Sequence, residues 1–94
     1  MEELIEKEEI EAWMKKVPEW ESDGISITRT AEYDEFMDAI DFVNGVAEVA
    51  EEAQHYPEIT VSGSIVTLKL MTDDEGGVTA LDFELASRID NLLD

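Results

Sequence analysis

The sequence contains no cysteine, a single histidine, two prolines and only six basic residues among 94. Without cysteine the chain can form no disulfide, has no thiolate nucleophile and cannot build a Cys-rich zinc site. No apolar run approaches the roughly 20 residues of a membrane-spanning helix, and the start of the chain lacks the basic and apolar regions of a signal peptide. We therefore expect a cytoplasmic protein with no membrane partner.

Basic residues are so few that the charge balance narrows the choice of partners. The chain carries 25 acidic residues against 6 basic ones, which gives a formal charge of −19. Direct binding to nucleic acid is not expected, because contacts with phosphates need clustered Lys and Arg. Two interpretations of the acidity stay open: adaptation to high salt, where self-repulsion is screened, or simple solubility.

The remaining composition is that of a folded domain. Hydrophobic residues make up 44 % of the chain, and both helical and strand periodicities occur, so an acidic disordered tail is excluded. We expect one domain over residues 1–94. A chain of this length buries only about 60 % of its unfolded surface, so association with other copies would stabilise it.

Hydrophobic periodicity and turn residues predict seven elements. In chain order they are a helix over 4–16, a short strand over 19–21, a strand over 25–31, a long helix from an N-cap at Asp34 to about His55, strands over 59–61 and 65–71, and a final helix that opens with the capping-box-like Thr79–Asp82. This order predicts an α+β fold with a four-stranded antiparallel sheet and helices packed on one face.

The same periodicity predicts which side chains face the core. We expect Val66, Leu68 and Leu70 to point inward from their strand. In the helices, the expected inward residues are Phe36, Ile40, Val43, Ala47 and Ala50, with Met37, Val46, Val49 and Ala53 widening that stripe, and Leu81, Leu85, Ile89 and Leu92.

His55 is the candidate for proton chemistry, because histidine is the side chain that ordinarily titrates near neutral pH. Pro57 disfavours a helical conformation at Tyr56, which places His55 at a helix C-terminus. Glu51 lies four residues earlier, so on a helix its carboxylate would share a face with the ring and could orient it. The alternatives are a helix cap or an ordinary surface ion pair.

Other chemistry finds little support in the sequence. No phosphate-binding glycine loop, dinucleotide fingerprint or HExxH motif is present. The acidic segment 72–77 is expected to be a solvated turn, because it lacks the ligand spacing and closing Glu of a calcium loop. We expect neither a metal nor a bound cofactor.

The run Glu51-x-x-x-His55-Tyr56-Pro57, followed by a hairpin and by Gly77–Asp82, resembles the signature of the pterin-4a-carbinolamine dehydratases. The wider resemblance covers nearly the whole chain. It includes Trp20, Ile27–Arg29, Phe36, Ala39–Ile40, Phe42–Asn44, Val46–Ala47, Ala50–Glu51, Ala86–Ser87 and Ile89–Asp90.

The resemblance implies a fold, an activity and an assembly. Members of the family have a four-stranded antiparallel sheet backed by helices, form dimers or tetramers, and bind the pterin beside the histidine motif. They dehydrate 4a-hydroxytetrahydrobiopterin to the quinonoid dihydropterin during cofactor recycling. The implied partners are therefore a pterin and further copies in a homodimer or homotetramer.

This sequence departs from the family pattern at three positions. The second motif histidine is replaced by Tyr56, the motif aromatic falls at Gly63, and the third histidine falls at Asp73, whereas Asp82 matches the final position. The first hypothesis is a hydro-lyase with His55 as acid and base, Glu51 orienting it, Asp73 aiding proton transfer, and Tyr56 and Pro57 binding substrate. The second is a weak or inactive member that serves as a protein-binding or assembly module.

Overall fold

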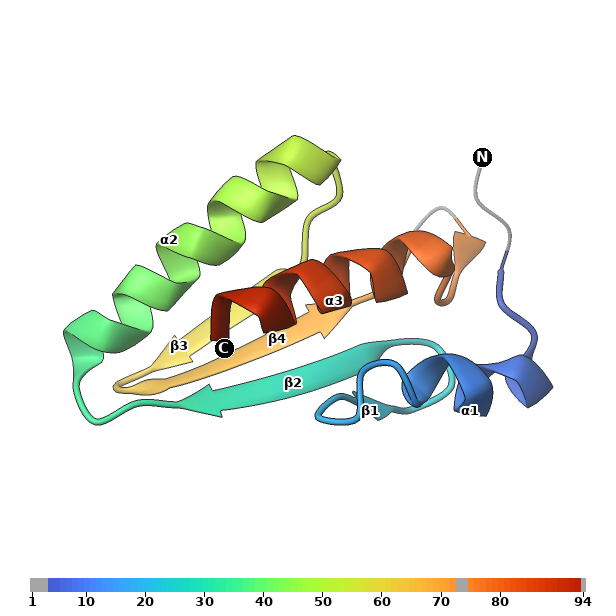
Figure 1. The fold of residues 1–94 in the computed structure, drawn as a ribbon, viewed down its shortest axis with the longest axis horizontal. Coiled ribbons are helices and arrows are strands. Elements are labelled where there is room, and N and C mark those ends of the chain that lie inside the picture. The colour runs from blue at the N-terminus through green and yellow to red at the C-terminus, as the bar shows by residue number, and fades with distance from the viewer. Residues whose placement is uncertain (1–3, 73–74, 94) are drawn as a thin grey trace.

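A computed structural model describes residues 4–72 and 75–93. Its elements are α1 (Lys7–Met14), β1 (Glu21–Ser22), β2 (Ile27–Glu32), α2 (Phe36–Ala53), β3 (Glu58–Ser62), β4 (Ile65–Leu70) and α3 (Ala80–Leu93). The strands form an antiparallel sheet in the order β1-β2-β4-β3. Helices α2 and α3 lie over one side of this sheet (Figure 1), so the predicted α+β class is confirmed.

The sheet turns its apolar residues toward the helices. Val66, Leu68 and Leu70 are buried, as their alternation in β4 predicts, and Ile27 of β2 pairs with Leu70. Threonine, lysine and glutamate occupy the alternate positions, so the uncovered face is mostly polar. A one-residue slip of β4 would move its whole apolar set to that face, which is why its pattern specifies the register.

Helix α2 differs from the prediction at its start and in its buried face. It begins after Glu35, whose side chain makes no capping hydrogen bond, and not after Asp34. Phe36 and Met37 are 53 % and 61 % exposed, and Ala47 is also exposed. The residues that α2 buries are Ala39, Phe42, Val46 and Ala50, of which Val46 and Ala50 were predicted. Apolar residues surround much of this helix, so periodicity alone could not choose the face.

The end of α2 determines where His55 lies. The helix stops at Ala53, and Gln54 takes a left-handed conformation with φ 53°. Its backbone N–H still reaches the carbonyls of the last turn, as in other left-handed helix ends. His55 is therefore outside the helix and begins the connector that descends to β3 (Figure 1).

Helices α1 and α3 both contribute buried side chains to the core. α1 is shorter than predicted, and Leu4 ahead of it bridges to Thr79 instead of continuing the helix. In α3 the predicted Leu85 and Ile89 are buried, whereas Leu92 is 42 % exposed. The core cluster joins residues of all three helices to β2 and β4. No helix in the described part of the chain has the length and apolar character needed to cross a bilayer.

Candidate functional site

His55 meets a carboxylate that is distant in the sequence. Its Nε2 lies 2.5 Å from Oδ1 of Asp82, 27 residues further along. The His55 side chain is 13 % exposed, whereas the Asp82 side chain is fully buried. The ring thus stands between a buried anion on one side and a partly open surface on the other.

Asp82 is buried because the start of α3 and the end of β4 supply its hydrogen-bond donors. Its Oδ2 accepts from the backbone N–H of Thr79 at 2.9 Å and from the hydroxyl of Thr72 at 3.0 Å. The first of these bonds is the half of the predicted capping box in which the acidic side chain reaches back to the N-cap. A helix N-terminus also favours negative charge. These contacts offset the cost of removing the carboxylate from water.

The contacts of Asp82 determine which imidazole nitrogen is free. A carboxylate only accepts hydrogen bonds, so the short contact makes Nε2 of His55 the donor. In the neutral ring the other nitrogen, Nδ1, then carries the lone pair. The arrangement of carboxylate and oriented imidazole is suited to taking up a proton at Nδ1 and stabilising the imidazolium that results.

A pocket of about 290 Å³ is lined by residues that follow His55 in the chain and by residues that precede Thr72. Tyr56, Pro57 and Glu58 line it from the connector and β3, and Lys69 and Met71 line it from β4. The residues flanking these segments, His55 and Thr72, are the ones that bond Asp82. Tyr56 is 60 % exposed, so its ring is available to a ligand.

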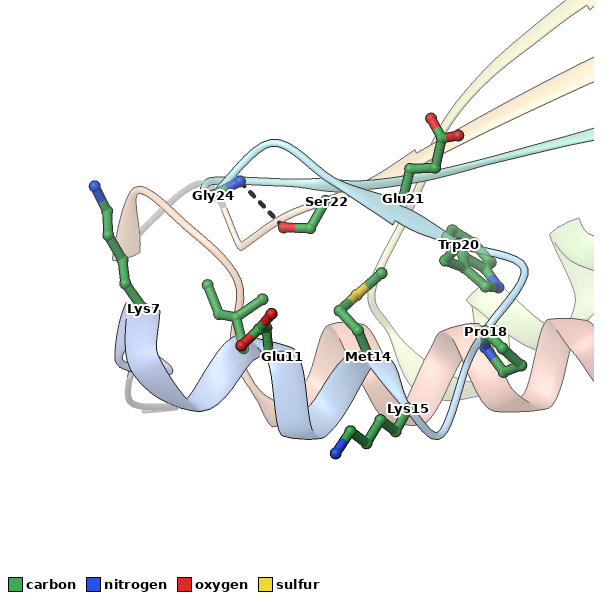
Figure 2. A pocket seen from close by; sticks show the side chains of 10 residues that line it. Lys7, Glu11, Met14, Lys15, Pro18, Trp20, Glu21, Ser22 and Gly24 are labelled. Atoms are coloured by element: carbon green, nitrogen blue, oxygen red, sulfur yellow. Dashed lines mark hydrogen bonds between the residues drawn. The ribbon is translucent and has the colours of Figure 1, made fainter.

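A larger hollow of about 1050 Å³ lies between α1 and β1. Figure 2 shows Met14 and Trp20 on its wall, with Lys7 and Lys15 at its margin. Neither His55 and Asp82 nor the residues next to them in the chain line it. Its size alone therefore gives no reason to place chemistry there.

The structure brings some predicted site residues together and not others. Tyr56 and Pro57 share the small pocket, and His55 adjoins it in the chain. Glu51 is exposed on α2, and the carboxylate that contacts the ring in the described residues is Asp82. The four-residue spacing to Glu51 orients a side chain only while both residues are helical, and Gln54 ends that condition. Asp73 lies outside the described residues.

Three residues of this arrangement were not predicted for the site. Asp82 was assigned a capping role and also matched the last motif position. Together these two signals could have identified it as a site residue. Thr72 and Lys69 gave no local signal, because their roles come from strand ends that meet only in the folded chain. Within the described residues no group of three or more acidic or histidine side chains is placed to hold a metal ion.

Comparisons with known proteins agree on one relationship. Residues 3–92 match the family model described as pterin 4 alpha carbinolamine dehydratase. A provisionally named pterin-4-alpha-carbinolamine dehydratase from Picosynechococcus sp. is 44 % identical over 84 residues, which is 89 % of this chain and 91 % of the relative.

Two solved structures share the fold. A transcriptional coactivator/pterin dehydratase from Brucella melitensis matches with a TM-score of 0.90 and 28 % identity, covering 97 % of this chain and 99 % of that one. A pterin dehydratase-like protein described as a RuBisCO assembly factor in the alpha-carboxysome matches with a TM-score of 0.63 over 78 % of this chain and 84 % of that one. Its 18 % identity shows similarity of fold alone.

Proposed function

Because this chain belongs to the family of the pterin 4 alpha carbinolamine dehydratases, we propose that it is a hydro-lyase that removes water from a 4a-hydroxytetrahydropterin. The observation that carries the proposal is the contact between His55 and the buried Asp82. It supplies an imidazole with one nitrogen held and the other available. The dehydration requires a positioned group that can accept a proton and then donate it, and such an imidazole can do both.

One proton carrier is sufficient for this reaction, because the proton removed from N5 is the proton that the departing hydroxyl needs. Nδ1 of His55 takes the proton from N5 of the substrate, the N5–C4a double bond forms, and the C4a–O bond breaks. The imidazolium then gives its proton to the departing hydroxyl, which leaves as water. The products are the quinonoid dihydropterin and water, and the ring returns to its neutral form while Asp82 holds it. The loss of two motif histidines therefore does not prevent turnover in principle.

The small pocket is the proposed place for the pterin. Tyr56 offers a ring that can stack on a flat heterocycle and a hydroxyl that can hydrogen-bond with it. Pro57 fixes the backbone that presents Tyr56. Lys69 and Glu58, which face each other across the β3–β4 ladder, supply a donor and an acceptor at the same pocket. The orienting role of Glu51 and the role of Asp73 in proton transfer stay predictions from the sequence.

Stopped-flow dehydration of a 4a-hydroxytetrahydropterin tests the proposal. Wild type is expected to exceed the spontaneous rate, and His55→Gln to lose about a hundredfold or more of kcat, because general acid–base catalysis contributes about 10²–10⁴-fold. Gln54→Ala is the matched control, since Gln54 is the exposed neighbour of His55. It is expected to match wild type.

Two outcomes would contradict this function. If wild type gives no acceleration over the spontaneous reaction, the chain is not a dehydratase and the assembly-module hypothesis gains support. If wild type and His55→Gln accelerate equally, the reaction occurs without the histidine, and its proposed role is wrong.

We also propose that the chain associates with itself as a homodimer or homotetramer. The exposed Phe36 and Met37 on α2 support this, because large apolar side chains that remain in water favour association. Sedimentation equilibrium is expected to give twice or four times the chain mass of 10.6 kDa. A monomer at all concentrations would overturn the proposal.

A further inference from the structure

A chain of hydroxyl contacts behind Asp82 joins the segment after β4 to the start of α3. Thr72 Oγ1 lies 3.0 Å from Oδ2 of Asp82 and 2.9 Å from Oγ1 of Thr79. Thr79 is fully buried, and Thr72 is half-buried. The dehydration scheme itself uses neither of the two threonine hydroxyls.

The direction of each hydrogen bond in this chain follows from the carboxylate. Because Asp82 only accepts, Thr72 must donate its hydroxyl hydrogen to Oδ2. Since the hydroxyl hydrogen of Thr72 is used in that bond, Thr79 must donate its own hydroxyl hydrogen to Oγ1 of Thr72. Oδ2 is thus occupied by two donors, Thr72 and the Thr79 N–H, and Oδ1 is left for His55.

We propose that Thr72 is a positioning residue that acts through Asp82 to hold His55 in the tautomer with the proton on Nε2 and the lone pair on Nδ1. This inference rests on the proposed function for its catalytic meaning. The hydroxyl of Thr72 fixes the rotation of the carboxylate, and the carboxylate fixes the ring. Loss of the hydroxyl leaves Asp82 with one donor fewer and frees it to turn away from the imidazole.

The hydroxyl can be removed without removing the loop contacts of Thr72, because these use its backbone. Its carbonyl accepts from the N–H groups of Glu75 and Gly76 at 3.0 Å, and its N–H donates to Gly77 at 2.8 Å. Valine has the same branched shape as threonine, so Thr72→Val deletes one donor and keeps the loop. Thr72→Ser restores the donor. Thr67→Val, made in β4 and away from Asp82, is the matched control.

The single histidine of this chain makes the test direct, because every imidazole nitrogen signal belongs to His55. Long-range ¹H–¹⁵N spectra of the neutral ring are expected to show Nε2 protonated and Nδ1 unprotonated in wild type, Thr72→Ser and Thr67→Val. In Thr72→Val the two tautomers are expected to mix. In the dehydration assay Thr72→Val is expected to lose about tenfold of kcat with little change in KM, the size expected for one hydrogen bond to a charged group.

The spectra test the positioning role of Thr72, and the assay of wild type tests the dehydratase function, so either hypothesis can be contradicted without the other. A protonated Nδ1 in wild type overturns the inference without any variant, even if Thr72→Val does not fold. An unchanged tautomer and kcat in a folded Thr72→Val overturn it as well. If the spectra change as expected but wild type does not accelerate the reaction, the positioning role stands and the dehydratase function fails.

Discussion

At the scale of single residues, the site depends on a buried carboxylate whose two oxygens both accept hydrogen bonds. Asp82 is fully buried and accepts from His55, Thr72 and the Thr79 backbone. An isolated buried carboxylate would be very unfavourable, whereas this one has three donors and the N-terminus of α3 beside it. The side chain therefore serves the helix start and the imidazole together.

We predict that Asp82→Asn reverses the tautomer of His55. The amide has one oxygen, which the two donors Thr72 and Thr79 would occupy, so its NH₂ would face the ring and donate to Nε2. The ring proton would then move to Nδ1 and remove the proposed base. We expect a loss of about a hundredfold or more in kcat, in line with the effect of a wrong tautomer in serine proteases.

The tautomer and the kcat of Asp82→Asn are measured by nitrogen NMR and by the dehydration assay. Circular dichroism serves as the control for folding, since the amide keeps the contacts with the start of α3. Full activity with an unprotonated Nδ1 would contradict the orienting role of Asp82.

At the scale of elements, the turn after α2 places His55 where Asp82 can reach it. Among the residues that the structure describes, Gln54 is the non-glycine residue with a left-handed backbone, at φ 53°. Side chains other than glycine pay about 1–2 kcal/mol in this conformation. The helix end is thus maintained by its surroundings and not by the preference of its own residue.

Replacing Gln54 by glycine is predicted to stabilise the protein. Glycine removes the steric cost of the left-handed conformation but adds entropy to the unfolded chain, so we expect a net gain of about 0.5–1 kcal/mol. For a chain of this size such a gain raises Tm by about 2–8 °C. Thermal unfolding measures it, with Gln54→Ala as a control that keeps the strained backbone. A lower Tm for Gln54→Gly than for Gln54→Ala would show that the turn is not strained.

At the scale of the whole molecule, negative charge dominates. The ion pairs between permanently charged groups in the described residues are two: Arg29 with Asp90 and Arg88 with Glu52. They leave most acidic side chains in the described part of the chain without a cationic partner, and the net charge of the sequence is −19. Such an excess destabilises the compact state through self-repulsion at low ionic strength.

We predict that Tm rises steadily as potassium chloride is increased from about 0.1 M to 1 M, because the Debye length falls from about 10 Å to 3 Å over this range. A variant that carries glutamine at the exposed Glu21, Glu32 and Glu48, none of which lies in the first turn of a helix, is the control. It should be more stable than wild type at low salt and respond less to added salt. A Tm that does not rise with salt would exclude the high-salt interpretation and leave simple solubility.

The sequence by itself determined the elements whose patterns involve near neighbours. The alternation of Val66, Leu68 and Leu70 specified the inward face of β4, and Thr79 with Asp82 marked the start of α3. The motif around His55 and Pro57 indicated the family. Each of these signals spans only a few residues, and strand or helix geometry converts it directly into structure.

Only the tertiary structure decided which face α2 buries and which carboxylate holds His55. Apolar residues surround much of α2, so packing against the sheet and α3 selected Ala39, Phe42, Val46 and Ala50. Glu51 was the near candidate for the imidazole, but the left-handed turn at Gln54 takes His55 out of the helix and toward Asp82. A contact across 27 residues depends on how α2 and α3 pack, and no local period encodes that.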